Sequence, residues 1–191
     1  MDQIYGPCPC SSGMKFKFCC LRKSPEELVK GAARFPLHEC LIADNGWEEH
    51  GMAVLYICRH AFNCRYICAF YMVDTYCLGL KNTFANVNLE RDRMLDVRRR
   101  LEQQDELQPY DYEDARSLIF GAIDYAASLG FSPNEDWQHS RYIVEEGRPY
   151  VPKFDYGKDG KPFYIQGPDD DAKSIMKTLA IADRNYLVRV N

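Results

Sequence analysis

Apolar and β-branched residues dominate three stretches between residues 36 and 80 of this chain. They read PLHECLIAD, GMAVLYICRH and CRYICAFYMVDTYCLGL. Such composition, bounded by turn-forming residues, predicts antiparallel strands. We expect a hairpin that joins residues 51–60 to residues 64–76 through the turn HAFNCR. The third stretch is long and almost wholly apolar, which is typical of a central or bulged strand.

Helical spacing of apolar positions predicts elements on both sides of this strand-rich region. Ser24 followed by Pro25 and two acidic residues is typical of a helix start, and Gly31 suits its end. We expect Asn88 to cap a surface helix over residues 89–107, whose apolar stripe is thin. The strongest helix prediction begins at Asp111 and ends before Gly130, with a wide apolar face.

The remaining chain predicts a hairpin over residues 150–167 with Asp159 and Gly160 in its turn. A last helix over residues 168–183, capped by Asp169 or Asp170, and a terminal strand over residues 185–191 complete the prediction. The expected fold class is α+β, with antiparallel strands and packed helices in the body of the protein.

Composition is that of a globular protein, with 46% hydrophobic and 27% charged residues among 191. A net charge of −4 argues against a general nucleic-acid binder. Arg98, Arg99 and Arg100 are interleaved with acidic residues, which favours ion pairs on a solvated helix face, so nucleic acid is possible but not favoured. No apolar run is long enough to span a membrane, and the start shows no signal peptide, so we expect a cytoplasmic protein.

Nine cysteines are an odd number, so they cannot all pair, and disulfides are rare in a reducing cytosol. Four of them form the pattern C-x-C-x8-C-C at Cys8, Cys10, Cys19 and Cys20. Pro9 can fix the turn between the first two, and the Ser-Ser-Gly at residues 11–13 can reverse the chain. Four thiolates that can reach one ion predict a closed structural zinc site.

The stretch PCPCSSGMKFKFCC resembles the SEC-C motif, the zinc-binding knuckle at the C-terminal tail of the SecA translocation ATPase, which is also attached to many unrelated bacterial proteins. Ser11 replaces the usual glycine, and Leu21 replaces a common trailing glycine. Neither departure removes a ligand. The resemblance covers about a tenth of the chain. It implies a bacterial protein in which zinc is bound by the four cysteines and the knuckle docks onto a protein or ribosomal partner.

We therefore expect three segments: a knuckle at residues 1–23, a linker helix at residues 24–35 and an α+β domain of unassigned role at residues 36–191. Phe16 and Phe18 are expected to cover the zinc site and join it to the body. Positive side chains near the thiolates would offset their charge and contact the partner. These side chains are Lys15, Lys17, Arg22 and Lys23.

An alternative function is that of an enzyme, a metal-dependent hydrolase or nuclease recruited by the knuckle. Asp74 lies within an apolar run, and a buried carboxylate is costly unless it is paired or bound to metal. Such an enzyme needs several acids around Mg²⁺, and Asp44, Glu113 and Asp124 are the candidates. A strand-end carboxylate bonded to backbone donors is the simpler interpretation of Asp74.

Two further sets of residues carry weaker hypotheses. Cys58, His60, Cys64 and Cys68 have the spacing C-x-H-x3-C-x3-C, which is uncommon for zinc, so buried apolar cysteines are favoured there. A nucleophile pair between Cys58 or Cys77 and a histidine has no local motif in its support. The histidines that could take part are His38, His50 and His139. Cys40 and Cys77 are expected to be small buried apolar groups. His139 and Trp47 are candidates for binding on exposed loops, although local packing is favoured for each.

Overall fold

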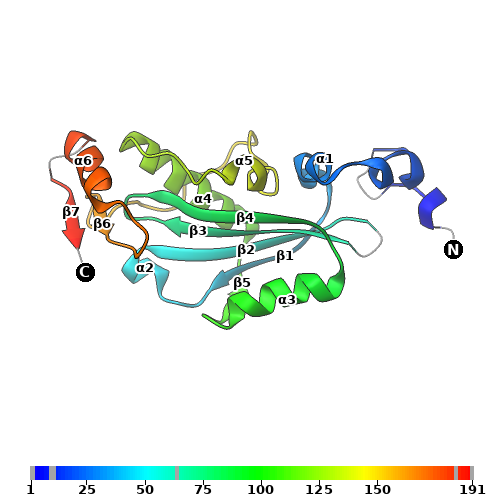
Figure 1. Cartoon of the computed structure of the whole chain (residues 1–191), viewed down its shortest axis with the longest axis horizontal. Helices are drawn as coiled ribbons and strands as arrows, with labels where there is room; N and C mark the ends of the chain where they lie inside the picture. Colours follow the sequence, from blue (N-terminus) through cyan, green and yellow to red (C-terminus); the bar gives the residue numbers. More distant parts are fainter. Residues whose placement is uncertain (1–2, 9–11, 63–64, 183–184, 190–191) are drawn as a thin grey trace.

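The computed structural model describes residues 3–8, 12–62, 65–182 and 185–189 (Figure 1). The fold is α+β, as expected. Five strands form the main sheet, and two short strands form a second sheet near the C-terminal end. The main-sheet strands are β1 (Leu37–Ala43), β2 (Met52–His60), β3 (Tyr66–Asp74), β4 (Gly79–Leu89) and β5 (Leu107–Pro109).

The main sheet has the order β4-β3-β2-β1-β5, and each neighbouring pair is antiparallel. The predicted hairpin is confirmed, because β2 and β3 pair in continuous register from Met52 opposite Asp74 to His60 opposite Tyr66. β3 is both interior and bulged, with register shifts against β4 near each end. Its nearly continuous apolar sequence fits a strand that is covered on both faces.

Two strands, β4 and β5, escaped the sequence prediction. β4 is the longest strand of the sheet, although its sequence GLKNTFANVNL is polar and rich in asparagine. Asn88 was predicted to cap a helix; instead it is the penultimate residue of β4 and has a φ of +59°. Asparagine tolerates this left-handed conformation better than most residues. The helix that follows, α3 (Arg91–Glu102), is preceded by Glu90 at the N-cap.

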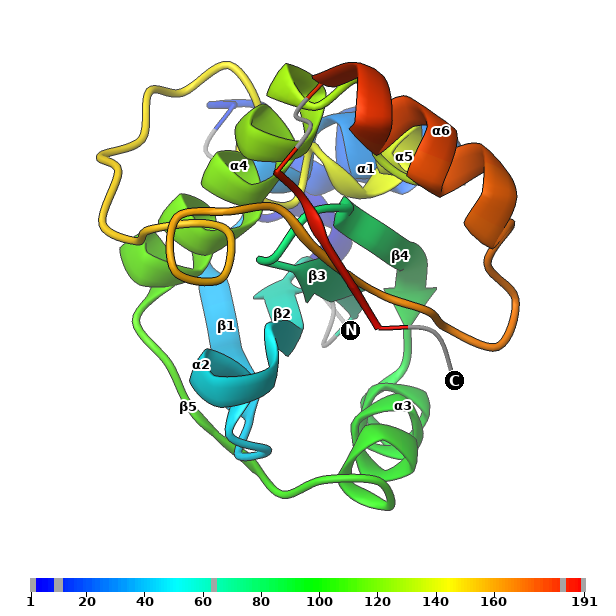
Figure 2. The ribbon, with the colours of Figure 1, turned by 90° about the vertical axis from the view of Figure 1, so that its left-hand side faces the viewer.

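Helices cover the two faces of the sheet unequally (Figure 2). α4 (Tyr112–Ser128), α5 (Trp137–Ser140) and α1 (Pro25–Lys30) lie over one face, and α3 lies under the other. α4 starts as predicted, because Asp111 Oδ1 accepts the Asp114 N–H at 2.9 Å. α1 carries a full capping box between Ser24 and Glu27 and ends at Gly31.

Two of the three arginines in the run on α3 are engaged in ion pairs, as the interleaved acids indicated. Arg98 contacts Glu102 at 2.8 Å and Glu39 of β1 at 3.1 Å, and Arg99 contacts Asp96 at 2.9 Å. Met94 is the buried anchor of this helix. α3 is therefore a surface helix on which Arg98 and Arg99 are held by neighbouring carboxylates.

The C-terminal region corrects two sequence expectations. Asp159 and Gly160 do form a tight turn, both with positive φ, flanked by an isolated bridge between Lys158 and Lys161. However, β6 (Phe163–Ile165) does not pair with the preceding segment as a hairpin would require. It pairs in parallel with the predicted terminal strand, β7 (Leu187–Arg189). Between them lies α6 (Ala172–Ala182).

The capping residue of α6 also differs from the prediction. Asp171, and not Asp169 or Asp170, accepts the N–H of Ser174 at 3.2 Å. Asp170 accepts the Gly167 N–H at 2.7 Å and contacts Lys81 of β4 at 3.0 Å. Asp170 therefore ties the C-terminal region to the main sheet.

Two buried arginines, one on β2 and one on α4, hold the segment of residues 143–149 against the sheet and this helix, and sequence reasoning missed both. Arg59 donates to the carbonyl oxygens of Ile143 and Phe35, each at 2.8 Å. Arg116 donates to the carbonyl oxygens of Val144 at 2.9 Å and Arg148 at 2.6 Å. The available signal was an arginine inside an apolar strand or helix face, which needs several acceptors when buried.

Candidate metal centre

The first half of the cysteine segment is a tight chain reversal. Pro7 and Lys15 form an antiparallel bridge, with the Cys8 N–H bonded to the Met14 oxygen at 2.8 Å and the Phe16 N–H bonded to the Gly6 oxygen at 3.0 Å. Gly13 has a φ of +74°, which glycine adopts without steric cost. The predicted reversal is thus confirmed at Gly13, while residues 9–11 lie outside the described part of the chain.

Two successive 3₁₀ turns then present the adjacent cysteines. Phe16–Phe18 and Cys20–Arg22 form these turns, and the Cys19 N–H is bonded to the Phe16 oxygen at 3.1 Å. The Sγ atoms of Cys8, Cys19 and Cys20 all lie within 4.8 Å of one another, and the three side chains are buried. Three of the four predicted ligands therefore converge; Cys10 lies outside the described residues.

The sulfur spacing fits a tetrahedral thiolate site. Zinc–sulfur bonds of about 2.3 Å at tetrahedral angles place neighbouring sulfurs about 3.8 Å apart. The Sγ atoms of Cys19 and Cys20 lie 3.9 Å apart. Ser12 Oγ is 3.2 Å from Cys19 Sγ, within hydrogen-bond distance of it. Such an outer contact is typical of metal ligands, whose orientation neighbouring polar groups fix. This group of three cysteines could hold a metal ion.

One aromatic residue attaches the cysteine segment to the body. The side chain of Phe16 is 1% exposed, and its ring centroid lies 4.7 Å from that of Phe62. The three cysteines and Phe16 belong to the same cluster of buried side chains as the sheet core. Phe18, which was predicted to cover the site, is instead 55% exposed.

The exposed side of the cysteine segment combines apolar and basic groups. Four of the nine exposed large apolar side chains in the described residues lie here, namely Tyr5, Met14, Phe18 and Leu21. Lys15 and Arg22 are exposed, and Lys17 and Lys23 are half-buried. The Lys17 ammonium lies 4.8 Å from the Tyr5 ring centroid, and the Arg22 guanidinium lies 5.5 Å from that of Phe18. We call these apolar and basic side chains the knuckle patch.

Asp74 adopts the simpler of its two predicted roles. It is the last residue of β3 and 5% exposed, and its Oδ1 accepts the N–H groups of Tyr76 at 2.8 Å and Cys77 at 3.0 Å. Burial raises the pKa of this carboxyl, while those N–H groups act in the opposite direction. Within the described residues, the cysteine group is the one cluster of three potential metal ligands, so Asp44, Glu113 and Asp124 are not gathered around Asp74.

The second cysteine set is divided between two contacts. Cys58 and Cys68 lie directly opposite each other on β2 and β3, with their Sγ atoms 2.7 Å apart and buried beside α3. The His60 ring lies instead against Tyr66, with ring centroids 5.3 Å apart. Cys64 lies outside the described residues. The described members thus behave as the buried cysteines that the sequence favoured.

Among the residues that the structure describes, the predicted pairs of Cys58 or Cys77 with a histidine are not found. Burial raises the pKa of the Cys40 thiol to about 12 and that of the Cys77 thiol further, which disfavours the reactive thiolate. Trp47 packs edge-on against Phe154 at 5.9 Å. His50 accepts the Met52 N–H at Nδ1, 3.3 Å away, and contacts the Asn45 oxygen through Nε2 at 2.7 Å. His139 lines a groove beside β4.

Comparisons with known proteins identify no relative: no family model, no curated protein and no solved structure matches this chain. The resemblance to the SEC-C motif therefore depends on the cysteine segment itself. In the described part of the chain, no helix has the length and apolar character that crossing a membrane requires.

Proposed function

We propose that residues 5–23 form a zinc-binding knuckle of the SEC-C kind, which docks this protein onto a protein or ribosomal partner. The observation that carries the proposal is the convergence of three buried thiols at metal-binding distance, with a sulfur spacing suited to zinc. Cys10 would supply the fourth ligand. A zinc ion held there would be structural, because a closed set of four ligands leaves no open position for a substrate.

Some residues of this segment attach it to the body of the protein, and others are available to contact a partner. Phe16 holds the segment against the body, and Ser12 contacts a ligand sulfur. Other residues of the segment form the knuckle patch, where exposed aromatic and basic groups lie together. Aromatic and arginine side chains are the groups most often enriched at protein interfaces, and basic groups also suit the phosphates of ribosomal RNA.

Elemental analysis tests the metal. We expect about one zinc per chain in protein purified under reducing conditions, and loss of that zinc in a variant that combines Cys8→Ser with Cys19→Ser. Cys77→Ala is the matched control, because Cys77 is buried in a different cluster, and it should retain zinc. Absence of zinc from the folded wild-type protein, or equal zinc in the two variants, would contradict the metal assignment.

Sedimentation with purified bacterial ribosomes, and affinity capture followed by identification of captured proteins, test the docking. The zinc-loaded wild-type chain should be retained, and the chelated chain should not. A variant combining Lys15→Glu with Phe18→Ala should keep its zinc and lose the partner. If this variant is retained as well as the wild type, the knuckle patch is not the docking surface.

A further inference from the structure

The two edges of the main sheet differ in how they are protected. β5, at one edge, has three residues and includes Pro109. β4, at the other edge, has eleven residues. Short edge strands and proline prevent further strands from pairing, whereas a long edge strand presents a row of backbone donors and acceptors. In the described part of the chain, no strand pairs with the outer side of β4.

The middle of β4 lacks the usual defences. Residues 82–86 pair with β3 in regular register, and the irregularities fall at the two ends of the strand. From Asn82 to Leu89 the strand has neither a charged residue nor a proline. Charged residues, proline and bulges are the devices by which soluble proteins block their sheet edges. Residues 82–86 carry none of these devices, which leaves a regular stretch of edge on which an extended segment can pair.

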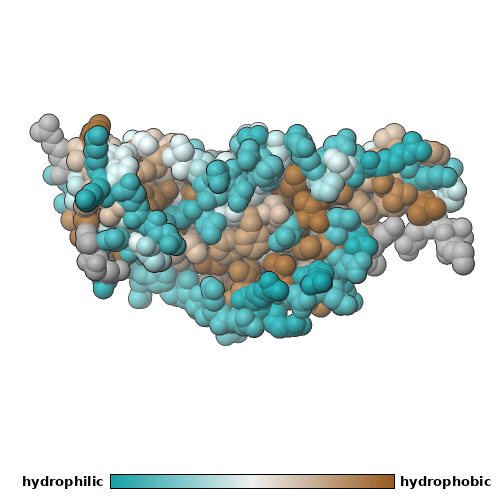
Figure 3. All heavy atoms as spheres, in the orientation of Figure 1, coloured by the Kyte–Doolittle hydropathy of each residue, from teal (hydrophilic) through white to brown (hydrophobic). Residues whose placement is uncertain are grey.

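The chain already uses the start of this edge for its own backbone. The N–H of Asn134 is bonded to the Leu80 oxygen at 3.0 Å, and its side-chain Nδ2 is bonded to the Lys81 oxygen at 3.3 Å. The segment before α5 thus attaches to the edge at Leu80 and Lys81 and then turns away into the helix. Beyond this point β4 continues below α5 and α1 (Figure 1). The surface in this region is apolar (Figure 3).

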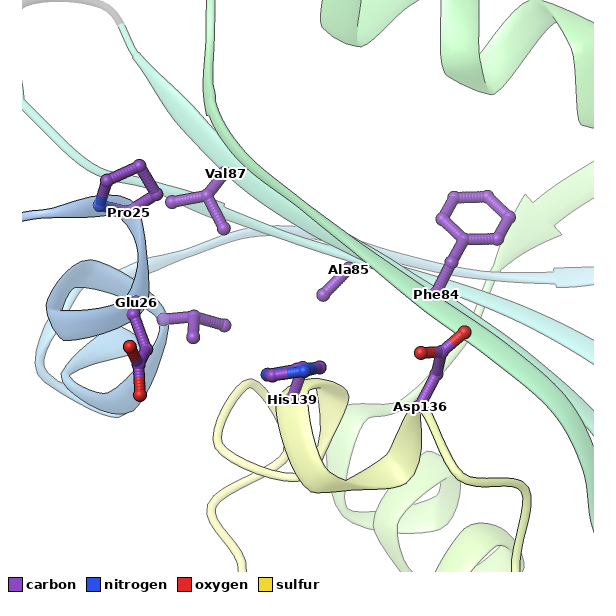
Figure 4. A pocket seen from close by; sticks show the side chains of 8 residues that line it. Pro25, Glu26, Phe84, Ala85, Val87, Asp136 and His139 are labelled. Atoms are coloured by element: carbon purple, nitrogen blue, oxygen red, sulfur yellow. The ribbon is translucent and has the colours of Figure 1, made fainter.

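A groove of about 390 Å³ lies beside this free edge, between α1 and α5. Ala85 and Val87 of β4 form its floor, Pro25 and Glu26 of α1 lie on one side, and His139 of α5 stands opposite (Figure 4). Val29 of α1 also lines it. The remaining side chains at its rim include Phe84 and Asp136. An extended peptide on β4 would direct alternate side chains towards this groove, because successive residues of a strand point to opposite faces.

The charge at the rim selects the side chain that fits. Glu26 and Asp136 lie at the two ends of the groove, with His139 between them (Figure 4). Glu26 is engaged by Lys30 at 2.7 Å, whereas no ion pair of Asp136 is found within the described residues. A lysine or arginine can lay its aliphatic stem on an apolar floor while its charged end reaches a carboxylate. Asp136 is the carboxylate available to it.

We propose that β4 and this groove bind an extended peptide segment of another protein by strand addition, with a lysine or arginine of that segment directed to Asp136. A second copy of this chain fits less well. The β4 strand carries one charged residue, Lys81, and that residue is already paired with Asp170 at 3.0 Å. This binding site does not depend on the proposed metal and lies outside the knuckle patch.

A displayed library of random nine-residue peptides, selected on the zinc-loaded full chain, tests the proposal. Selected sequences should carry lysine or arginine flanked, two positions away on either side, by β-branched or aromatic residues. The consensus peptide, acetylated and amidated, is then titrated by fluorescence anisotropy. Asp136→Lys should weaken its binding by at least about tenfold, because a charge-assisted contact becomes a repulsive one. Glu48→Lys, an exposed charge reversal on α2 (Trp47–His50), is the matched control and should bind as the wild type does.

Backbone pairing has its own readout. Peptides N-methylated at alternate residues should fall into two classes, since one set of amides faces β4 and the other faces solvent, and only the first set should lose binding. Selection of no sequence above the Asp136→Lys background would overturn the proposal. So would equal binding by the two N-methylated sets, or a dimer in sedimentation whose contact protects the β4 amides from hydrogen exchange.

Discussion

Replacement of Phe16 by alanine should destabilise the whole protein, because this ring joins the cysteine segment to the sheet core. The side chain is 1% exposed and packs against Phe62 at 4.7 Å. Removing a fully buried phenylalanine costs about 3–5 kcal/mol of unfolding free energy, which includes the cavity that it leaves. For a chain of this length that corresponds to a fall in Tm of at least about 6 °C.

Phe18→Ala is the matched control, two residues away in the same 3₁₀ turn. Its side chain is 55% exposed and contacts the Arg22 and Lys17 cations at 5.5 and 5.9 Å from the ring centroid. Substitutions at such surface positions usually change stability by about 0.5 kcal/mol or less. The same chemical change should therefore give a large effect at one position and almost none at the other.

The assay is urea unfolding of both variants, followed by circular dichroism and by release of zinc to a chromogenic chelator. In the wild-type protein we expect the two signals to change together, since the cysteines and the sheet share one buried cluster. Phe16→Ala should move both midpoints to lower urea concentration. Equal midpoints for the two variants would refute the reasoning, as would a zinc-release midpoint that shifts while the circular-dichroism midpoint stays unchanged.

Two further substitutions test the interior of the fold. Burial raises the pKa of Asp74, so its ionisation weakens the folded state, and stability should decline as pH rises from its usual pKa of 3.8 through the raised value. Asp74→Asn keeps an acceptor for the two N–H groups and should remove that decline in urea titrations between pH 4 and 8, whereas Asp74→Ala should cost about 1–3 kcal/mol; parallel pH profiles of wild type and Asp74→Asn would contradict this. Gly79→Ala should cost about 3 kcal/mol in thermal unfolding, because φ is +68° and the new Cβ would lie 2.7 Å from Ala126 Cβ and 2.8 Å from the Ala122 oxygen. Its control is Gly160→Ala, which has a φ of +73° but no neighbour within 4 Å and should cost about 1 kcal/mol; equal losses at the two glycines would refute the packing argument.

Local signals were sufficient where one residue type determines the structure. Asp111 caps α4, Ser24 begins α1, and the apolar runs of β2 and β3 pair as a hairpin. In each case the deciding interaction lies within a few residues or between neighbouring segments. The cysteine spacing belongs to the same class, because a short reversal at Gly13 is enough to bring Cys8 towards Cys19 and Cys20.

Local sequence patterns were not sufficient where a strand or side chain pairs with a segment far away in the sequence. The turn at Asp159 and Gly160 was predicted correctly, but a turn does not determine which strand lies beside β6. The partner, β7, follows a helix and is reached by a parallel connection, which no local pattern encodes. The anchors Arg59 and Arg116 were missed for the same reason, because each donates to carbonyl oxygens that lie more than 20 residues away along the chain.

The polar, asparagine-rich sequence of β4 explains why sequence reasoning missed this strand, and its lack of charge from Asn82 to Leu89 explains why the strand is a suitable binding surface. Asparagine-rich sequence has low strand propensity, so β4 forms because β3 offers it an open edge and apolar neighbours. Pairing with β3 on one edge is enough to stabilise β4, so its stability does not require charged residues along the other edge. Its uncharged outer edge from Asn82 to Leu89 is therefore left for a partner, beside a groove whose rim carries Asp136. On this reasoning, peptide binding constrains the sequence of β4 more than that of any other strand in the sheet. The charge of Asp136 determines which side chain the groove accepts.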